Sequence, residues 1–106
     1  MFYVYILTNI HKTVLYTGVT NNLQIRVAEH YHKRFETSSF AGKYSCFNLI
    51  YYEEYTSIKD AIAREKIIKN PSRAWKQKLI ASMNPEWKFY NEALFDSWPP
   101  DVGYYR

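Results

Sequence analysis

The chain has 106 residues, enough for one domain around one hydrophobic core, and 47% of them are hydrophobic. Its formal net charge is +4, and its one cysteine, Cys46, argues against an internal disulfide and a four-ligand zinc site. No apolar run reaches the roughly 18 residues of a membrane span. Residues 2–7 are too short for a signal segment, so we expect a cytoplasmic protein with no membrane partner.

Two strands open the predicted order. Residues 2–7 are rich in aromatic and β-branched side chains, and residues 13–17 follow them after a polar connection. Gly18 is expected to end the second strand, so that the two strands form a hairpin. The pair Thr20–Asn21 offers good helix caps and predicts a helix that runs to about Lys33.

A third strand and a helix come next. Residues 35–44 predict a loop or a short helical turn, and residues 46–53 predict the third strand. Ser57 and Asp60 resemble a capping box, which indicates a helix that runs to about Lys69.

The remaining elements complete a mixed α/β (α+β) order. Pro71-Ser72 predicts the start of another helix, which is expected to stop near Asn84-Pro85. The aromatic tail, residues 89–106, is expected to be irregular and packed on the same domain. The whole order is therefore β-β-α-β-α-α.

One carboxylate interrupts the apolar stripe of the 57–69 helix. Ile58, Ala61, Ile62 and Ile68 are spaced three and four apart, and Glu65 falls in the middle of them. A carboxylate aimed at apolar surroundings is costly unless it is paired or binds a metal. The alternative is a Glu65 that reaches the rim and pairs with a lysine or arginine.

The first helix carries two basic residues on one face. Arg26 and His30 follow Leu23 at helical spacing. Arginine grips phosphate with two donors, and histidine ordinarily titrates near neutral pH and can pass a proton. The ordinary alternative is a helix flank on which Glu29 pairs with Arg26.

Tyrosines and a glycine mark the hairpin. Tyr3 and Tyr5 share one face of the first strand, opposite Val4 and Ile6. Taken alone, Tyr5 is a core residue with a satisfied hydroxyl. Gly18 lets a backbone or ligand approach closely, or is only a turn residue.

Taken together, these residues resemble the GIY-YIG nuclease family. Tyr3-Val4-Tyr5 looks like its first tripeptide and Tyr16-Thr17-Gly18 like its second. The offsets of Arg26 and His30 fit, and Arg64-Glu65-Lys66 resembles the family's metal-binding glutamate segment. The resemblance is closest to the small stand-alone bacterial members. It covers residues 2–88, and residues 1–88 would form the catalytic domain.

The chain departs from the family pattern at several positions. Tyr3 stands for the first motif's glycine, and Thr17 stands for an aliphatic residue in the second. Asn70-Pro71 replaces a Gly or Asn followed by an aromatic residue. Asn84 is the nearest candidate for the family's late asparagine, or it only ends a helix. These departures bear on substrate fit more than on chemistry.

The resemblance implies a small three-stranded antiparallel sheet flanked by helices, and a metal-dependent endonuclease. Glu65 would hold one Mg²⁺ or Mn²⁺, and Arg26 would stabilise transition-state charge. Tyr5 or Tyr16 would orient or deprotonate the attacking water, with help from the metal, Arg26 or His30. We expect these five residues to converge on one concave face.

Nucleic acid is the implied partner, DNA more than RNA. Residues 59–88 hold eight basic and three acidic side chains, which could face a polyanion or form an ordinary solvated surface. The predicted phosphate contacts are Lys66, Lys69, Arg73 and Lys76. The chain is too short for a separate specificity domain. Sequence-specific cleavage would therefore need a partner, which could be a second copy in a weak homodimer or another protein. The alternatives are a non-catalytic nucleic-acid-binding module and a partner-binding domain.

Overall fold

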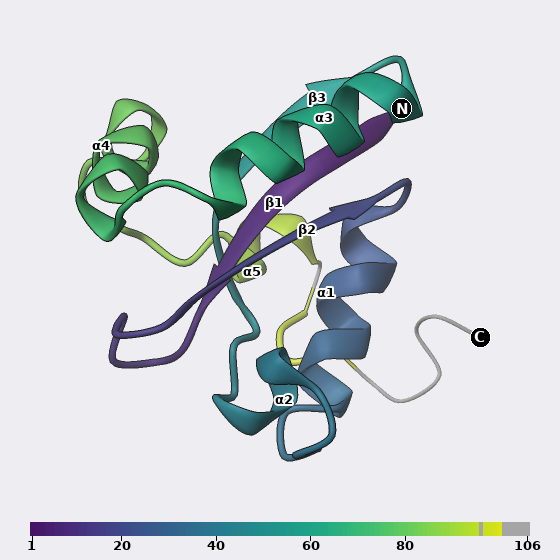
Figure 1. Cartoon of the computed structure of the whole chain (residues 1–106). Helices are drawn as coiled ribbons and strands as arrows, with labels where there is room; N and C mark the ends of the chain where they lie inside the picture. Colours follow the sequence, from purple (N-terminus) through teal and green to yellow (C-terminus); the bar gives the residue numbers. More distant parts are fainter. Residues whose placement is uncertain (96, 101–106) are drawn as a thin grey trace.

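A three-stranded antiparallel sheet lies at the centre of the computed structural model, which describes residues 1–95 and 97–100. Its strands are β1 (Phe2–Thr8), β2 (Leu15–Thr20) and β3 (Asn48–Tyr55), in the spatial order β2-β1-β3. β1 is therefore the central strand, and β2 and β3 form the two edges (Figure 1). This arrangement confirms the predicted fold class.

Helices cover both faces of the sheet, with α1 on one side and α3 on the other (Figure 1). In chain order they are α1 (Leu23–His32), α2 (Phe40–Lys43), α3 (Ile58–Lys69), α4 (Arg73–Met83) and α5 (Asn91–Leu94). Within the described part of the chain, each helix is too short or too polar to cross a membrane.

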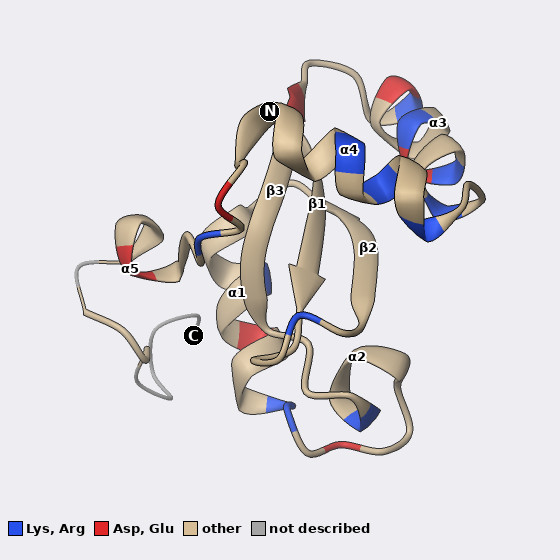
Figure 2. Ribbon diagram, turned by 90° about the vertical axis from the view of Figure 1, so that its left-hand side faces the viewer, with Lys and Arg blue, Asp and Glu red and all other residues tan. Residues whose placement is uncertain are grey.

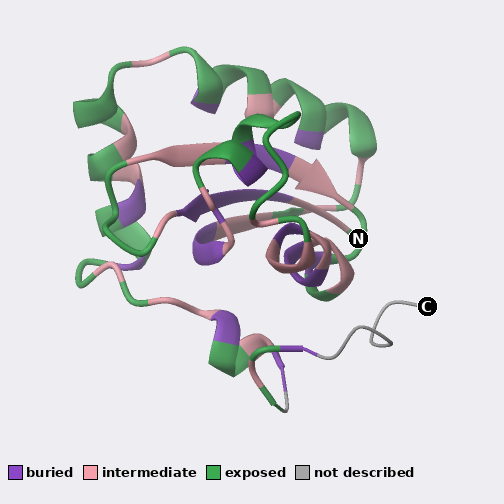
Figure 3. Ribbon diagram, turned by 90° about the horizontal axis from the view of Figure 1, so that it is seen from below, coloured by how far each residue is buried: buried purple, intermediate pink, exposed green. Residues whose placement is uncertain are grey.

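The pleat of β1 divides the interior into two cores. Tyr5 and Leu7 pack with α1 residues such as Val27, whereas Val4 and Ile6 pack with α3 and α4 on the opposite face. Buried segments therefore line the strands and the inward sides of the helices, while the outer turns are exposed (Figure 3). Tyr3 and Tyr5 share a face as the alternation predicts.

Two predicted boundaries around Gly18 are wrong. Gly18 does not end β2 but lies inside it, directly opposite Tyr5. The strand continues to Thr20, whose hydroxyl accepts a hydrogen bond from the Asn22 N–H at 3.1 Å and closes the turn. The cap of α1 is consequently Asn22, whose side chain accepts from Ile25 N.

The apolar stripe of α3 is narrower than the sequence predicts. Ala61 and Ile68 are fully buried, but Ile58 and Ile62 are 42% and 39% exposed. A sheet of three strands covers only part of the helix, so one side of the stripe extends beyond it. The predicted caps are confirmed, because Ser57 accepts from Asp60 N and the helix ends at Lys69.

Two buried asparagines fasten the segment after α4 to β3. The Asn84 amide donates to Ile50 O at 2.9 Å and to Lys88 O at 2.8 Å. The Asn91 side chain accepts from Leu49 N at 2.8 Å. Asn84 thus both ends α4 and braces the sheet, and its amide is fully used in that role.

The tail is more regular than predicted at its start. It forms the short helix α5, after which Trp98 packs edge-on against Tyr31, with ring centroids 5.1 Å apart. Trp98 also contacts Phe47 and Phe95. The rest of the predicted tail, residues 101–106, lies outside the described residues.

Candidate functional site

The ring of Tyr5 crosses the edge strand at Gly18. An added Cβ at Gly18 would lie 2.6 Å from the Tyr5 Cζ and closer still to its hydroxyl oxygen. Only a glycine leaves this space, because a Cβ would occupy the position of the phenol. Tyr5 is a fully buried core residue, but its ring passes over Gly18, so its hydroxyl lies toward the outer edge of β2.

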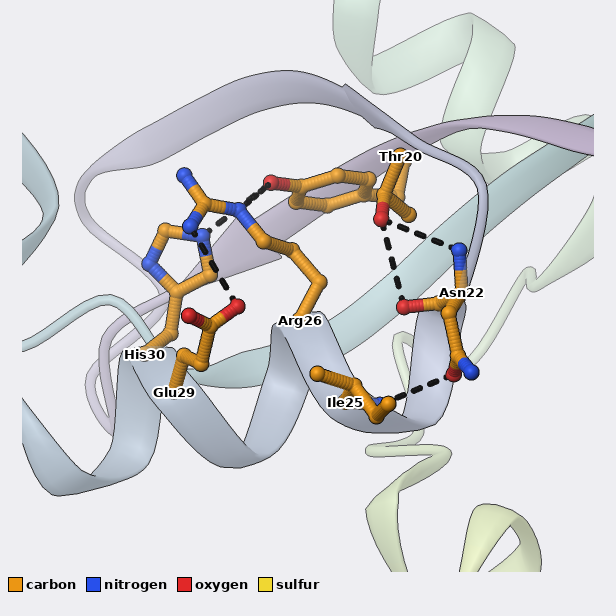
Figure 4. A network of polar contacts seen from close by, with 7 residues as sticks. Thr20, Asn22, Ile25, Arg26, Glu29 and His30 are labelled. Atoms are coloured by element: carbon orange, nitrogen blue, oxygen red, sulfur yellow. Dashed lines mark hydrogen bonds and ion pairs between the residues drawn. The ribbon is translucent and has the colours of Figure 1, made fainter. Parts of the chain in front are cut away.

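Two side chains of α1 meet this hydroxyl. The Arg26 Nε–H donates to the Tyr5 oxygen at 3.2 Å, and the His30 Nε2 lies 3.1 Å from the same oxygen. Figure 4 shows Arg26 and His30, one turn apart on the helix, converging on the phenol. Since the oxygen accepts from Arg26, its own proton is available to donate to His30.

Burial fixes the protonation of this pair. Desolvation, aided by the charges of Arg26 and Lys33, lowers the pKa of His30 to about 4. The expectation that His30 titrates near neutral pH is therefore wrong, because the imidazole has lost its water. Burial also raises the pKa of Tyr5, with smaller effects of Tyr16 and Glu65 in the same direction. At neutral pH a protonated phenol thus donates to a neutral imidazole.

Tyr16 is the accessible phenol of the site. Its ring is half-buried and packs edge-on against His30, with centroids 5.1 Å apart. It lines a cavity of about 200 Å³ together with Arg26, Glu29 and His30. A molecule entering this cavity would meet Tyr16, whereas Tyr5 lies behind it.

The Arg26 guanidinium is held between the phenol and a carboxylate. Its Nη1 lies 3.6 Å from Glu29 Oε1, one turn along α1, and its side chain is half-exposed at the cavity. The Glu29 pairing is thus present together with the Tyr5 contact. A positioned, partly desolvated arginine of this kind suits a phosphate or developing negative charge.

Glu65 reaches the region from the other layer. Helix α3 packs on the face of the sheet opposite Tyr5, so Glu65 approaches from the other layer, and the convergence of all five residues on one concave face stays a prediction. Arg64 is paired with Glu53 of β3, and the next residue, Glu65, lies about 100° further around the helix. Its charge still makes a small contribution to the raised pKa of Tyr5, so the two side chains interact electrostatically.

The Glu65 carboxylate has an ordinary partner as well. Its Oε2 lies 3.4 Å from Lys69 Nζ, and the glutamate side chain is 20% exposed. The salt-bridge alternative for Glu65 is thus present in the structure, but such an i,i+4 pair stabilises by only about 0.2–0.5 kcal/mol. Among the described residues, no three His, Cys, Asp or Glu side chains form a metal cluster. One carboxylate fits Mg²⁺, which usually keeps several waters and takes one or two protein carboxylates.

The predicted phosphate contacts divide into two kinds. Positive charge gathers over α3 and α4 (Figure 2), where Lys66 and Lys69 are exposed. Arg73 donates to Lys12 O and Thr13 O, both at 2.8 Å, and Lys76 donates to Lys69 O at 3.1 Å. The last two side chains therefore hold the β1–β2 hairpin and the end of α3, and keep their charge at the surface.

Sequence reasoning missed the role of Phe40. It lines the cavity opposite Arg26 and stacks near Tyr16, with ring centroids 6.4 Å apart. The residue lies in the 35–44 stretch, whose pattern predicts only a loop or turn. An aromatic residue among Thr37, Ser38 and Ser39 was the available signal.

The chain is similar to one protein family and to several curated proteins. The family model described as "GIY-YIG catalytic domain" matches residues 1–78. A UPF0213 protein of Natronomonas pharaonis is 39% identical over 79 residues, covering 74% of this chain and 89% of its own length. UPF0213 proteins of Syntrophus aciditrophicus (39% over 88 residues, 79% and 93% covered) and Clostridium perfringens (33% over 98 residues, 89% and 98%) are also similar. No solved structure matches significantly.

Proposed function

Because the chain belongs to the GIY-YIG catalytic domain family, whose fold carries nuclease-type function, we propose that it is a divalent-metal-dependent endonuclease that hydrolyses phosphodiester bonds in DNA. The observation that carries the proposal is the cavity where Tyr16 and Arg26 meet. It presents a phenol and a cation to one small space, with a carboxylate across the neighbouring strand edge.

Each side chain has a role that its surroundings support. Arg26 would bind the scissile phosphate and meet the charge that grows on it in the transition state. Tyr16 would orient the attacking water, because it is the phenol that faces the cavity. Tyr5 would hold Arg26 in place by accepting from its Nε–H, and His30 would fix the Tyr5 hydroxyl from the other side.

Glu65 would hold a Mg²⁺ or Mn²⁺ ion. When bound, the ion supplies Lewis-acid stabilisation of the phosphate oxygens. Lys69 pairs with Glu65 in this structure and would be released to a neighbouring phosphate when the metal binds. The exposed Lys66 would contact the DNA backbone. Sequence specificity would then require a second copy or a partner, because these contacts read no bases.

The test is cleavage of a panel of labelled single-stranded, duplex and branched DNA and RNA substrates in Mg²⁺, Mn²⁺ and EDTA. Glu65→Gln should abolish cleavage at nearly constant volume while leaving thermal unfolding and DNA binding in EDTA intact. Glu86→Gln, which removes an exposed carboxylate elsewhere, is the matched control and should cleave normally. Wild-type rates for Glu65→Gln would show that Glu65 is only a salt-bridge residue. Binding without cleavage by wild type in any metal would favour a binding module.

A further inference from the structure

An aromatic ladder leads from the candidate site to the protein surface. Phe40 stacks near Tyr16, with ring centroids 6.4 Å apart and planes at 25°. Tyr44, one helical turn beyond Phe40, follows with a centroid distance of 4.9 Å. Three rings therefore form a continuous path out of the cavity that holds Arg26.

The outer two rings are exposed although they are large and apolar. Phe40 is 52% and Tyr44 41% exposed. They line a second cavity of about 370 Å³, beside Leu15 of β2, and Phe40 forms part of both cavities. A strand of nucleic acid bound at Arg26 would therefore reach these rings first when it leaves the site in this direction.

The turn that carries the two rings is firmly held. Ser39 caps it by accepting from Gly42 N at 3.1 Å, and Cys46 N donates to Ala41 O at 2.8 Å. Ala41 and Gly42 are buried, so the opposite face of the turn is packed inward. A rigid aromatic platform loses little conformational freedom when a ligand stacks on it.

Positive charge surrounds the platform. Arg73 and Lys76 line the second cavity, and Lys43 Nζ lies 5.4 Å from the centre of the Tyr44 ring. Within residues 1–95 and 97–100, none of these three cations is paired with a carboxylate. Flat apolar faces framed by unneutralised cations match a ligand with aromatic bases and a phosphate backbone.

We propose that Phe40 and Tyr44 form a stacking site for an unpaired base of the DNA strand whose phosphate lies at Arg26. A base inside a duplex has both faces covered by its neighbours, so only a single-stranded or splayed segment can use the platform. The inference rests on the proposed function, because that function places the phosphate of the DNA strand at Arg26. It adds a preference for single-stranded over fully paired DNA.

The test measures binding rather than cleavage, so that it does not depend on catalysis. Fluorescence anisotropy in Ca²⁺ would compare a labelled oligothymidylate of about 15 nucleotides, near the upper end of typical single-strand site sizes, with a blunt duplex of equal length. The variant Phe40→Leu/Tyr44→Leu removes both π-faces and keeps apolar volume. Phe35→Leu is the matched control, because Phe35 is 78% exposed and lies outside the ladder.

Wild type should bind the single strand more tightly than the duplex. The double variant should lose roughly 5- to 150-fold in single-strand affinity, the range for one lost stacked base, with duplex affinity unchanged. Unaltered single-strand binding, or an equal loss on the duplex, would overturn the inference. A loss equal to that of Phe35→Leu would also overturn it.

A second measurement uses wild type alone, so the inference can still be tested if the double variant Phe40→Leu/Tyr44→Leu does not fold. Binding of wild type to an oligonucleotide containing 2-aminopurine should quench its fluorescence, because stacking on an aromatic ring quenches this base. Unchanged fluorescence on a bound oligonucleotide would refute the platform. Quenched binding without cleavage in Mg²⁺ or Mn²⁺ would refute the proposed nuclease and leave the stacking site standing.

Discussion

Mild acid should destabilise the fold through one residue, His30. The imidazole is 9% exposed, and burial, with the charges of Arg26 and Lys33, lowers its pKa to about 4. In the unfolded chain the pKa is about 6.5. Between these two values the unfolded state binds more protons than the folded state. The free energy of unfolding should therefore be highest above pH 6.5 and fall as the pH is lowered toward 4.

The two pKa values set the size of the effect. Each pH unit within the window costs about 1.4 kcal/mol, so His30 alone should lower the free energy of unfolding by about 2 kcal/mol at pH 5. The pKa of the Glu53 carboxyl is lowered too; burial opposes this shift, and hydrogen bonds from Arg64, Tyr51 and Tyr55 outweigh it. The stability that Glu53 contributes is present above about pH 4.5. A loss of stability between pH 7.5 and pH 5 therefore reports on His30 and not on Glu53.

Urea unfolding near pH 7.5 and near pH 5 measures the difference. His30→Gln keeps an acceptor for the Tyr5 hydroxyl and removes the titrating group, so its stability should change much less between these two conditions. His11→Gln is the control, because His11 is exposed. Equal losses in wild type and His30→Gln would refute the assignment of a buried neutral imidazole.

Four further substitutions have outcomes that follow from the structure. Arg26→Ala should lower the cleavage rate on the order of a hundredfold or more while weakening DNA binding in Ca²⁺ only slightly, and equal losses would mean that Arg26 merely holds the backbone. Gly18→Ala should destabilise by about 1–3 kcal/mol in thermal or urea unfolding, because its Cβ overlaps the Tyr5 phenol. Lys66→Ala should reduce the slope of log affinity against log salt by about 0.9, and Arg73→Ala should in addition lower Tm, since Arg73 also holds the hairpin.

The sequence predicted local features where one residue type decides the outcome. Ser57 and Ser72 cap α3 and α4, and alternation placed Tyr3 and Tyr5 on one face. Gly18 misled the prediction, because a glycine in a strand pattern can mark a turn or a close approach of another group, and the pattern alone does not say which. The Tyr5 phenol occupies the space beside Gly18, and Tyr5 lies thirteen positions earlier in the chain. The close approach can therefore be predicted only when the pairing of the two strands is known.

The sequence predicted which candidate residues lie together on one helix, but not which face of the sheet each helix covers. Helical spacing brought Arg26 and His30 together because both belong to one helix. Glu65 belongs to a helix on the other side of the sheet, and no pattern within either helix says which face it covers. The altered pKa of His30 arises from burial by distant residues, which is likewise invisible in a local pattern.

The asparagines that fasten the C-terminal segment also cover the start of the outer edge of β3, at Leu49 and Ile50, against pairing with other copies of the chain. The outer edge of β3 would otherwise offer unpaired backbone groups to which a foreign strand could bind. Tyr90 N donates to Leu49 O at 2.7 Å, and the amides of Asn84 and Asn91 occupy the groups beside it. Side-chain amides satisfy an edge without becoming a strand, so they give an incoming chain no ladder to extend. Shortening the protein after α4 would uncover this edge and favour aggregation.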